Sequence, residues 1–74
     1  MVRIRLKVLL AELEITQQEL AAMTGIKQPI ISSYCRNQAK NLSLDNIDVI
    51  CKVLHCRIDQ LLEYIDDKNN TTEN

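Results

Sequence analysis

The sequence contains no tryptophan and no phenylalanine, and it has only two tyrosines, one glycine and one proline. Because aromatic residues are so scarce, a hydrophobic core must be built from aliphatic side chains, and hydrophobic residues do make up 46% of the chain. The scarcity of glycine and proline excludes collagen-like and low-complexity chains. A chain of 74 residues forms one small domain that buries roughly 60% of its unfolded surface, so we expect marginal stability.

Long apolar runs are also missing. No segment approaches the ~20 apolar residues that a membrane-spanning helix needs. The basic start followed by apolar residues 8–11 is similar to a secretory signal, but Glu12 and Glu14 interrupt it and no small-residue cleavage site follows. Three cysteines, an odd number, make a poor disulfide framework. We therefore expect a cytoplasmic protein with reduced thiols and no membrane partner.

Metal-binding and catalytic patterns are weak. Cys35, Cys51, His55 and Cys56 are the possible zinc ligands, but a structural site needs four well-placed ligands and Cys51 falls on an apolar helix stripe. We expect Cys51 and Cys56 to be small buried hydrophobes and Cys35 to be exposed near a helix end. A lone histidine and a lone glycine provide neither a Ser-His-Asp arrangement nor a glycine-rich phosphate loop. The sequence thus predicts no catalytic residues, no metal and no cofactor.

The near-neutral net charge of -1 hides an uneven distribution. Residues 1–42 carry six basic and three acidic side chains, whereas residues 43–74 carry three basic and seven acidic ones. A basic surface on one side of the molecule is compatible with an anionic partner, and equally with plain solubility. Residues 66–74 are polar to the end and predict a disordered tail.

Apolar spacing predicts five helices and two short strands. Residues 2–6 alternate apolar and charged side chains, which is the strand period, and residues 63–65 could pair with them. In such an edge strand, Arg3 and Arg5 are expected at exposed positions. The helices are expected over about 6–14, 17–23, 28–36, 44–54 and 58–62.

Local signals mark the ends of these helices. Thr16 and Glu19 form a capping box, and Gly25 ends the helix that the box begins. Asn37 is the best stop for the third helix because Asn tolerates positive φ, and Ser43 caps the fourth. The buried stripe of the fourth helix is predicted to comprise Leu44, Ile47, Ile50, Cys51 and Leu54.

The segment 17–36 is the most informative part of the chain. Two helices separated by a turn with a glycine are typical of a helix-turn-helix, whose helices cross at about 90–120°. Ala21 is small enough for close helix packing. The expected apolar anchors of the motif are Leu20, Ile26, Ile31 and Tyr34.

The sequence TQQELAAMTGIKQPIISSYCRNQ resembles the Cro- and phage-repressor-like helix-turn-helix family, also called the xenobiotic-response-element family. The resemblance covers residues 2–65 and extends through LSLDNIDVICKVLHC and DQLLEYI. It implies an all-α, five-helix lambda-repressor-like DNA-binding domain over residues 1–65, with the motif at 17–36. It also implies a minimal regulator that binds a double-stranded operator, usually as a homodimer, and has no small-molecule domain.

The resemblance also assigns roles to individual positions. The second helix of the motif enters the major groove with its N-terminal residues against base edges. This sequence departs from the family pattern at two positions, which are Cys35, where an acidic residue is common, and Asn37, where glycine is common. The implied base contacts are Lys27, Gln28, Pro29, Ser32 and Ser33, and the implied phosphate contacts are Gln17, Arg36, Lys40 and Asn41.

The leading hypothesis is a sequence-specific DNA-binding transcriptional regulator, with a repressor favoured over an activator. Because the recognition helix is poor in arginine and the net charge is slightly acidic, a protein-interaction module of the same fold, such as an antitoxin or anti-repressor, is an alternative. A thiol- or metal-responsive regulator is a third hypothesis, and it needs Cys35 to be reactive.

Overall fold

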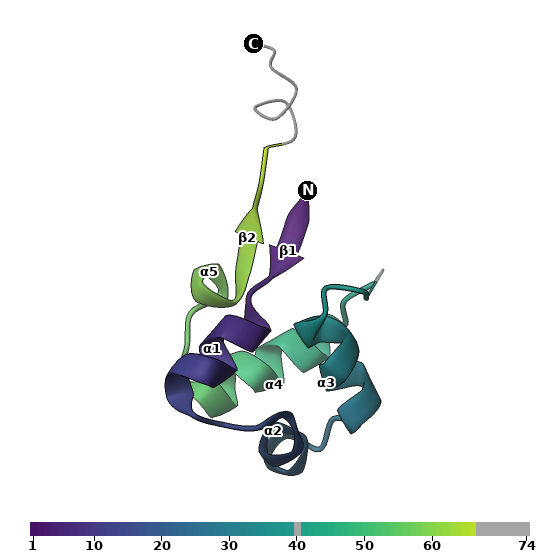
Figure 1. Cartoon of the computed structure of the whole chain (residues 1–74), viewed down its shortest axis with the longest axis vertical. Coiled ribbons are helices and arrows are strands. Elements are labelled where there is room, and N and C mark those ends of the chain that lie inside the picture. Colours follow the sequence, from purple (N-terminus) through teal and green to yellow (C-terminus); the bar gives the residue numbers. More distant parts are fainter. Residues whose placement is uncertain (40, 67–74) are drawn as a thin grey trace.

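Five helices form the body of the molecule, and a two-stranded antiparallel ribbon extends from it (Figure 1). The structure is a computed structural model that describes residues 1–39 and 41–66. The all-helical prediction with short terminal strands is therefore confirmed. The elements are β1 (Val2–Ile4), α1 (Leu6–Leu13), α2 (Gln17–Thr24), α3 (Gln28–Cys35), α4 (Leu44–Leu54), α5 (Ile58–Leu61) and β2 (Leu62–Tyr64).

The predicted capping residues set the helix boundaries. The Thr16 hydroxyl accepts from the backbone N–H of Glu19 at 3.0 Å, and the Glu19 carboxylate accepts from the N–H of Thr16 at 2.8 Å. Gly25 ends α2 with a φ of 78°. The Ser43 hydroxyl accepts from the N–H of Asn46 at 3.3 Å. Each bond pairs a backbone group that a helix end leaves without a partner.

Two boundaries have features that the sequence analysis did not single out. α1 is followed by Glu14, which adopts a φ of 57° although it is not glycine. α5 begins after Arg57, whose backbone N–H donates to the side-chain oxygen of Gln60 at 2.7 Å. The short α5 therefore does have a cap, supplied by a glutamine three residues into the helix rather than by a serine or threonine before it.

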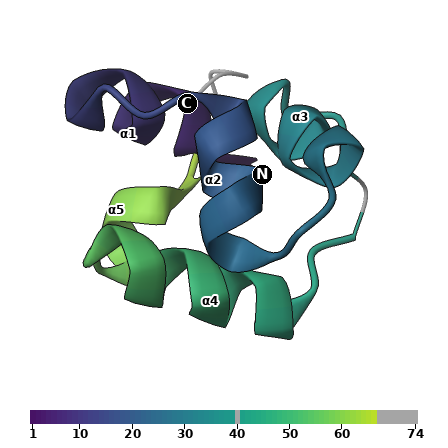
Figure 2. The ribbon, with the colours of Figure 1, turned by 90° about the horizontal axis from the view of Figure 1, so that it is seen from below.

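The core is aliphatic, as the composition requires. Each helix contributes one completely buried side chain, and these are Leu6, Leu20, Ile31, Ile50 and Leu61. Tyr34 is also buried, and its hydroxyl accepts from the side-chain amide of Asn46 at 3.1 Å, so α3 and α4 are joined by a polar bond at the edge of the core. Figure 2, seen from below, shows α1 and α4 on opposite sides of the view, and Figure 1 shows that α2 lies beneath both of them.

Two burial predictions were wrong, and two more were met only in part. Leu44 is 82% exposed, because it lies at the first residue of α4 while Leu42, from the preceding loop, packs against the core in its place. Cys35 is only 5% exposed, because the last residue of α3 faces α1. Cys51 and Cys56, expected to be buried, are half-buried and pack against the core.

The ribbon joins the two ends of the domain. Val2 pairs with Tyr64, Arg3 with Glu63 and Ile4 with Leu62. The predicted pairing of residues 2–5 with 63–65 is therefore confirmed, with strand bounds that differ by one residue. Arg3 is exposed on β1, while Arg5 lies just beyond the strand, before α1. In the predicted tail only Asp66 is among the described residues. No helix in the described part of the chain is long and apolar enough to cross a bilayer.

Candidate nucleic-acid interface

The turn between α2 and α3 is held by a threonine that the sequence analysis did not single out. The Thr24 hydroxyl donates to the carbonyl of Leu20 at 2.8 Å and accepts from the N–H of Ile26 at 3.1 Å. Gly25 lies between these two bonds at positive φ, and Ile26 inserts into the core with 8% of its surface exposed. A threonine directly before the glycine is the sequence signal that could have identified these two hydrogen bonds across the turn.

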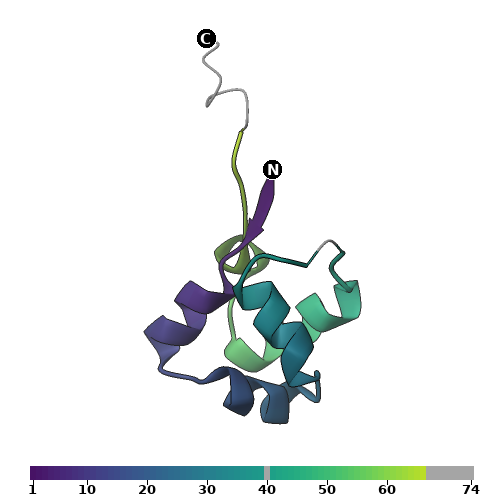
Figure 3. The ribbon, with the colours of Figure 1, turned by 45° about the vertical axis from the view of Figure 1, so that its right-hand side comes forward.

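The N-terminal end of α3 presents side chains to solvent. Lys27, Gln28 and Pro29 are all exposed, while Ile31, two residues further on, is completely buried and fixes the rotation of the helix. Lys27 occupies the N-cap position and its side chain makes no capping bond. Figure 3 shows that α2 and the start of α3 lie at the end of the body away from the ribbon. The end of the helix that a major groove would receive is therefore open.

Ser32 and Ser33 lie one turn along α3 and are half-buried. The Ser33 hydroxyl donates to the carbonyl of Ile30 at 2.7 Å, so its proton is occupied within the helix. The Ser32 hydroxyl accepts from the guanidinium of Arg36, which also donates to the side-chain oxygen of Gln38 at 2.9 Å. The structure thus brings together a predicted base contact, Ser32, and a predicted phosphate contact, Arg36.

The other predicted phosphate contacts are spread over two more segments. Gln17 is half-buried at the first residue of α2, directly after the Thr16 cap. Asn41 is exposed in the segment before α4. Lys40 lies outside the described residues. Helix starts and backbone amides of this kind are favourable places for phosphate groups because of the positive end of the helix dipole.

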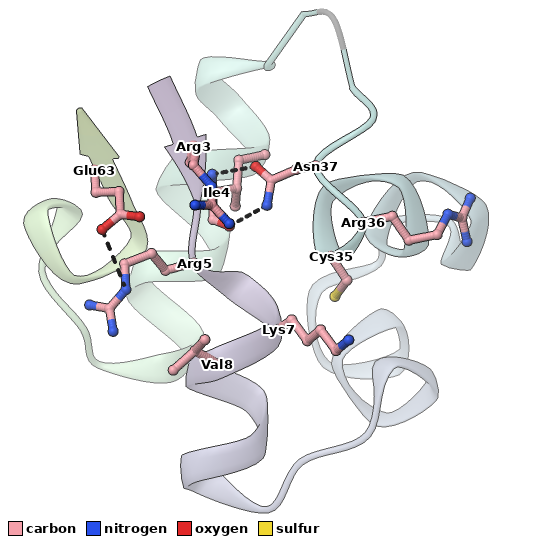
Figure 4. A pocket seen from close by; sticks show the side chains of 9 residues that line it. All are labelled: Arg3, Ile4, Arg5, Lys7, Val8, Cys35, Arg36, Asn37 and Glu63. Atoms are coloured by element: carbon pink, nitrogen blue, oxygen red, sulfur yellow. Dashed lines mark hydrogen bonds and ion pairs between the residues drawn. The ribbon is translucent and has the colours of Figure 1, made fainter. Parts of the chain in front are cut away.

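Asn37 ties the end of α3 to β1, a role that the sequence did not reveal. Its side-chain oxygen accepts from the N–H of Ile4 at 2.7 Å, and its side-chain nitrogen donates to the carbonyl of Ile4 at 2.9 Å (Figure 4). Asn37 has a φ of 55°, which confirms it as the helix stop. α3 is therefore anchored to the ribbon at its C-terminal end.

The thiols do not form an exposed reactive site. Burial raises the pKa of the Cys35 thiol, and nearby Lys7 and Arg36 only partly oppose this shift. Burial and the neighbouring Cys51 raise the pKa of Cys56 as well. A raised pKa keeps a thiol in its less nucleophilic protonated form at neutral pH. Among the described residues, no three His, Cys, Asp or Glu side chains are grouped so that they could hold a metal ion.

Matches to known proteins include a family model, a curated protein and a solved structure. Residues 5–67 match the model of the Cro/C1-type HTH DNA-binding domain. The chain is 32% identical over 66 residues to the uncharacterized HTH-type transcriptional regulator YozG of Bacillus subtilis (strain 168), covering 89% of this chain and 79% of that protein. It is 33% identical to a crystal structure from Bacteroides fragilis of a candidate DNA-binding protein, with a TM-score of 0.76 over 85% of this chain and 100% of that one.

Proposed function

Since this chain belongs to the Cro/C1-type helix-turn-helix DNA-binding domain family, we propose that it is a transcriptional repressor that binds a specific operator as a homodimer. The observation that carries the proposal is the open N-terminal end of α3, where Lys27, Gln28 and Pro29 are exposed beside a rigid turn. The proposed location is the cytoplasm, as for a regulator that binds chromosomal DNA directly.

Base recognition is assigned to the exposed face of α3. The Gln28 amide can make two hydrogen bonds to an adenine edge, and Lys27 can donate to a guanine edge or to a phosphate. Ser32 and Ser33 can bond bases or phosphates once they face the groove, and Pro29 supplies an apolar contact. Each good bidentate contact is worth ~1–3 kcal/mol of discrimination, so one half-site alone gives limited selectivity.

Affinity is assigned mainly to the DNA backbone. Gln17 at the start of α2, Arg36 after α3, and Lys40 and Asn41 before α4 are the proposed phosphate contacts. Arg36 is already ordered on Ser32 at the edge of the recognition surface, which supports its role beside the base contacts. Binding that depends on phosphate contacts releases counterions and therefore weakens steeply as salt increases.

The homodimer would double this small recognition surface. The ribbon is the proposed contact because Val2 and Tyr64, which pair directly across it, are 60% and 71% exposed. They continue the apolar face that Ile4 and Leu62 begin inside the body. A two-stranded ribbon is marginal by itself, and a second copy would cover its apolar face.

Selection of binders from a random duplex DNA pool near physiological salt tests this proposal. The expected result is a two-fold symmetric motif with half-site centres about one helical turn, ~34 Å, apart. Gln28→Ala should relax the preference at one position of each half-site, whereas Lys40→Ala should weaken binding to all sequences alike. Equal loss of preference from both changes would contradict the assigned roles. No enrichment with folded protein would favour a protein-interaction module.

A further inference from the structure

A cavity of about 440 Å³ lies where β1, the start of α1 and the end of α3 meet, outside the proposed base contacts (Figure 4). Its charged lining consists of four cationic side chains and one acidic one. The cations are Arg3, Arg5, Lys7 and Arg36, and the acid is Glu63. These residues come from three segments that are distant in the sequence, so the cluster exists only in the folded protein.

The positive charge of this cavity is largely uncompensated. Glu63 approaches one cation, Arg5, at 4.0 Å, and both side chains are about 40% exposed. Within residues 1–39 and 41–66, no carboxylate lies within ion-pair distance of Arg3, Lys7 or Arg36. Arg36 instead donates to two neutral oxygens, on Ser32 and Gln38, and in Figure 4 its guanidinium points away from the other labelled cations. Among the described residues, four cations thus line the hollow, and one of them, Arg5, has an acidic partner.

The start of α1 adds to the same field. No side chain caps this eight-residue helix, and its first turn contains no acidic residue. Lys7 and Val8, in that first turn, both line the cavity. The positive end of the helix dipole and its unpaired N–H groups therefore point to the place where the cations gather. An uncapped helix start and a cationic hollow are two separate features, and both favour an anion.

We propose that this cavity is a binding site for a phosphate group. Arginine offers a planar fork of donors that matches phosphate oxygens, and three cations with no carboxylate partner among residues 1–39 and 41–66 suit a doubly charged group. Arg36 lines the cavity and also borders α3, so the source that we test first is a backbone phosphate of bound DNA beyond the C-terminal end of α3, away from the bases read at its N-terminal end. That source rests on the proposed function, whereas binding of a free phosphorylated ligand does not.

The first arm of the test measures the salt dependence of DNA binding for the full chain. Lys7→Gln removes one cavity charge from an exposed helix position. If a backbone phosphate occupies the cavity, the slope of log affinity against log salt should fall by about 0.9 without any change in base preference. Arg3→Gln should act in the same direction. Lys52→Gln is the matched control, because Lys52 lies on α4 and does not line the cavity.

The second arm uses pyrophosphate without DNA. Saturable shifts of the backbone amides of Lys7 and Val8 in NMR spectra, lost in Lys7→Gln and kept in Lys52→Gln, would support the site even if the DNA slope is unchanged, and would identify a free ligand as its source. This arm also holds if the wild-type protein binds no DNA, in which case the repressor proposal fails and the cavity proposal stands. If Lys7→Gln and Arg3→Gln alter neither the slope nor the pyrophosphate shifts, the cavity proposal is overturned.

Discussion

Asn37 has two structural roles, one through its backbone conformation and one through its side chain. Its backbone adopts a φ of 55°, and its amide makes both hydrogen bonds that a neighbouring strand would make to Ile4. β1 is thus bordered by β2 on one edge and by a single asparagine on the other. Glycine would satisfy the backbone, but only an amide offers a donor and an acceptor at the required places.

Substitutions at Asn37 should separate these two roles. Asn37→Ala loses two hydrogen bonds worth about 1 kcal/mol each and places an alanine in the left-handed region, so we expect ~2–4 kcal/mol of destabilisation. Asn37→Gly loses the same bonds without the backbone strain and should cost less. Asn37→Asp keeps the acceptor for the N–H of Ile4, but it places a carboxylate oxygen, which cannot donate, opposite the carbonyl oxygen of Ile4. Urea unfolding measures the stability of all three variants. An Asn37→Ala variant as stable as wild type would show that the two hydrogen bonds between Asn37 and Ile4 do not stabilise the fold.

Cys35 makes the stability depend on pH at the alkaline end. Burial raises the pKa of its thiol above the usual value of 9.0, so the folded protein holds a proton that the unfolded chain releases. The stabilisation is complete below about pH 9 and is lost as the pH rises through the higher folded-state pKa. We expect the free energy of unfolding to fall more steeply above about pH 9 in wild type than in Cys35→Ala. Parallel curves from urea titrations would show that the thiol does not ionise on unfolding.

At the scale of elements, the helix ends were predictable because their partners are close in sequence. Thr16 and Glu19 are three residues apart, as are Ser43 and Asn46, so the pattern itself contains both ends of each bond. The bond between Asn37 and Ile4 spans 33 residues and depends on how α3 meets β1, which no local pattern encodes. The exposure of Leu44 has the same origin. Periodicity identifies the apolar face of a helix, but it does not show how far along that face the other elements of the core extend.

The two caps should differ in strength. At α2 both bonds of the capping box are formed, at 2.8 and 3.0 Å, whereas the Ser43 hydroxyl at α4 makes one bond of 3.3 Å. Thr16→Ala should therefore cost about 1 kcal/mol of stability and Ser43→Ala less. Thermal unfolding of the two variants compares them directly, with Thr16→Ser as the control that keeps the hydroxyl. A larger loss from Ser43→Ala would contradict the ranking.

At the scale of the whole molecule, the fold places the recognition surface and the ribbon at different ends of the body (Figure 1). The sequence predicted which residues form the helix-turn-helix, because its anchors and its glycine lie within one short window. It did not predict the cationic cavity, which is assembled from β1, α1 and α3 only when the chain folds. The proposed contacts with bases and phosphates remain predictions, and Lys40 lies outside the described residues.

The location of the dimer contact can be tested with two exposed apolar residues. Tyr64 on the ribbon is 71% exposed and Ile58 on α5 is 56% exposed. If the ribbon joins two copies, Tyr64→Ser should raise the dimer dissociation constant at least ~10-fold, because buried aromatic residues dominate such contacts. Ile58→Ser should leave it nearly unchanged. Sedimentation equilibrium gives both constants, and the opposite pattern would move the contact to α5.

The pair of hydrogen bonds between Asn37 and Ile4 also has a consequence for movement within the molecule. It ties the C-terminal end of α3 to the strand, while Ile31 in the middle of α3 and Tyr34 near its end are buried in the core. The C-terminal end of α3 and β1 are therefore linked directly, in addition to packing on the same body. Because of this link, we expect a restraint on the ribbon to limit how far the C-terminal end of α3 can move relative to the body.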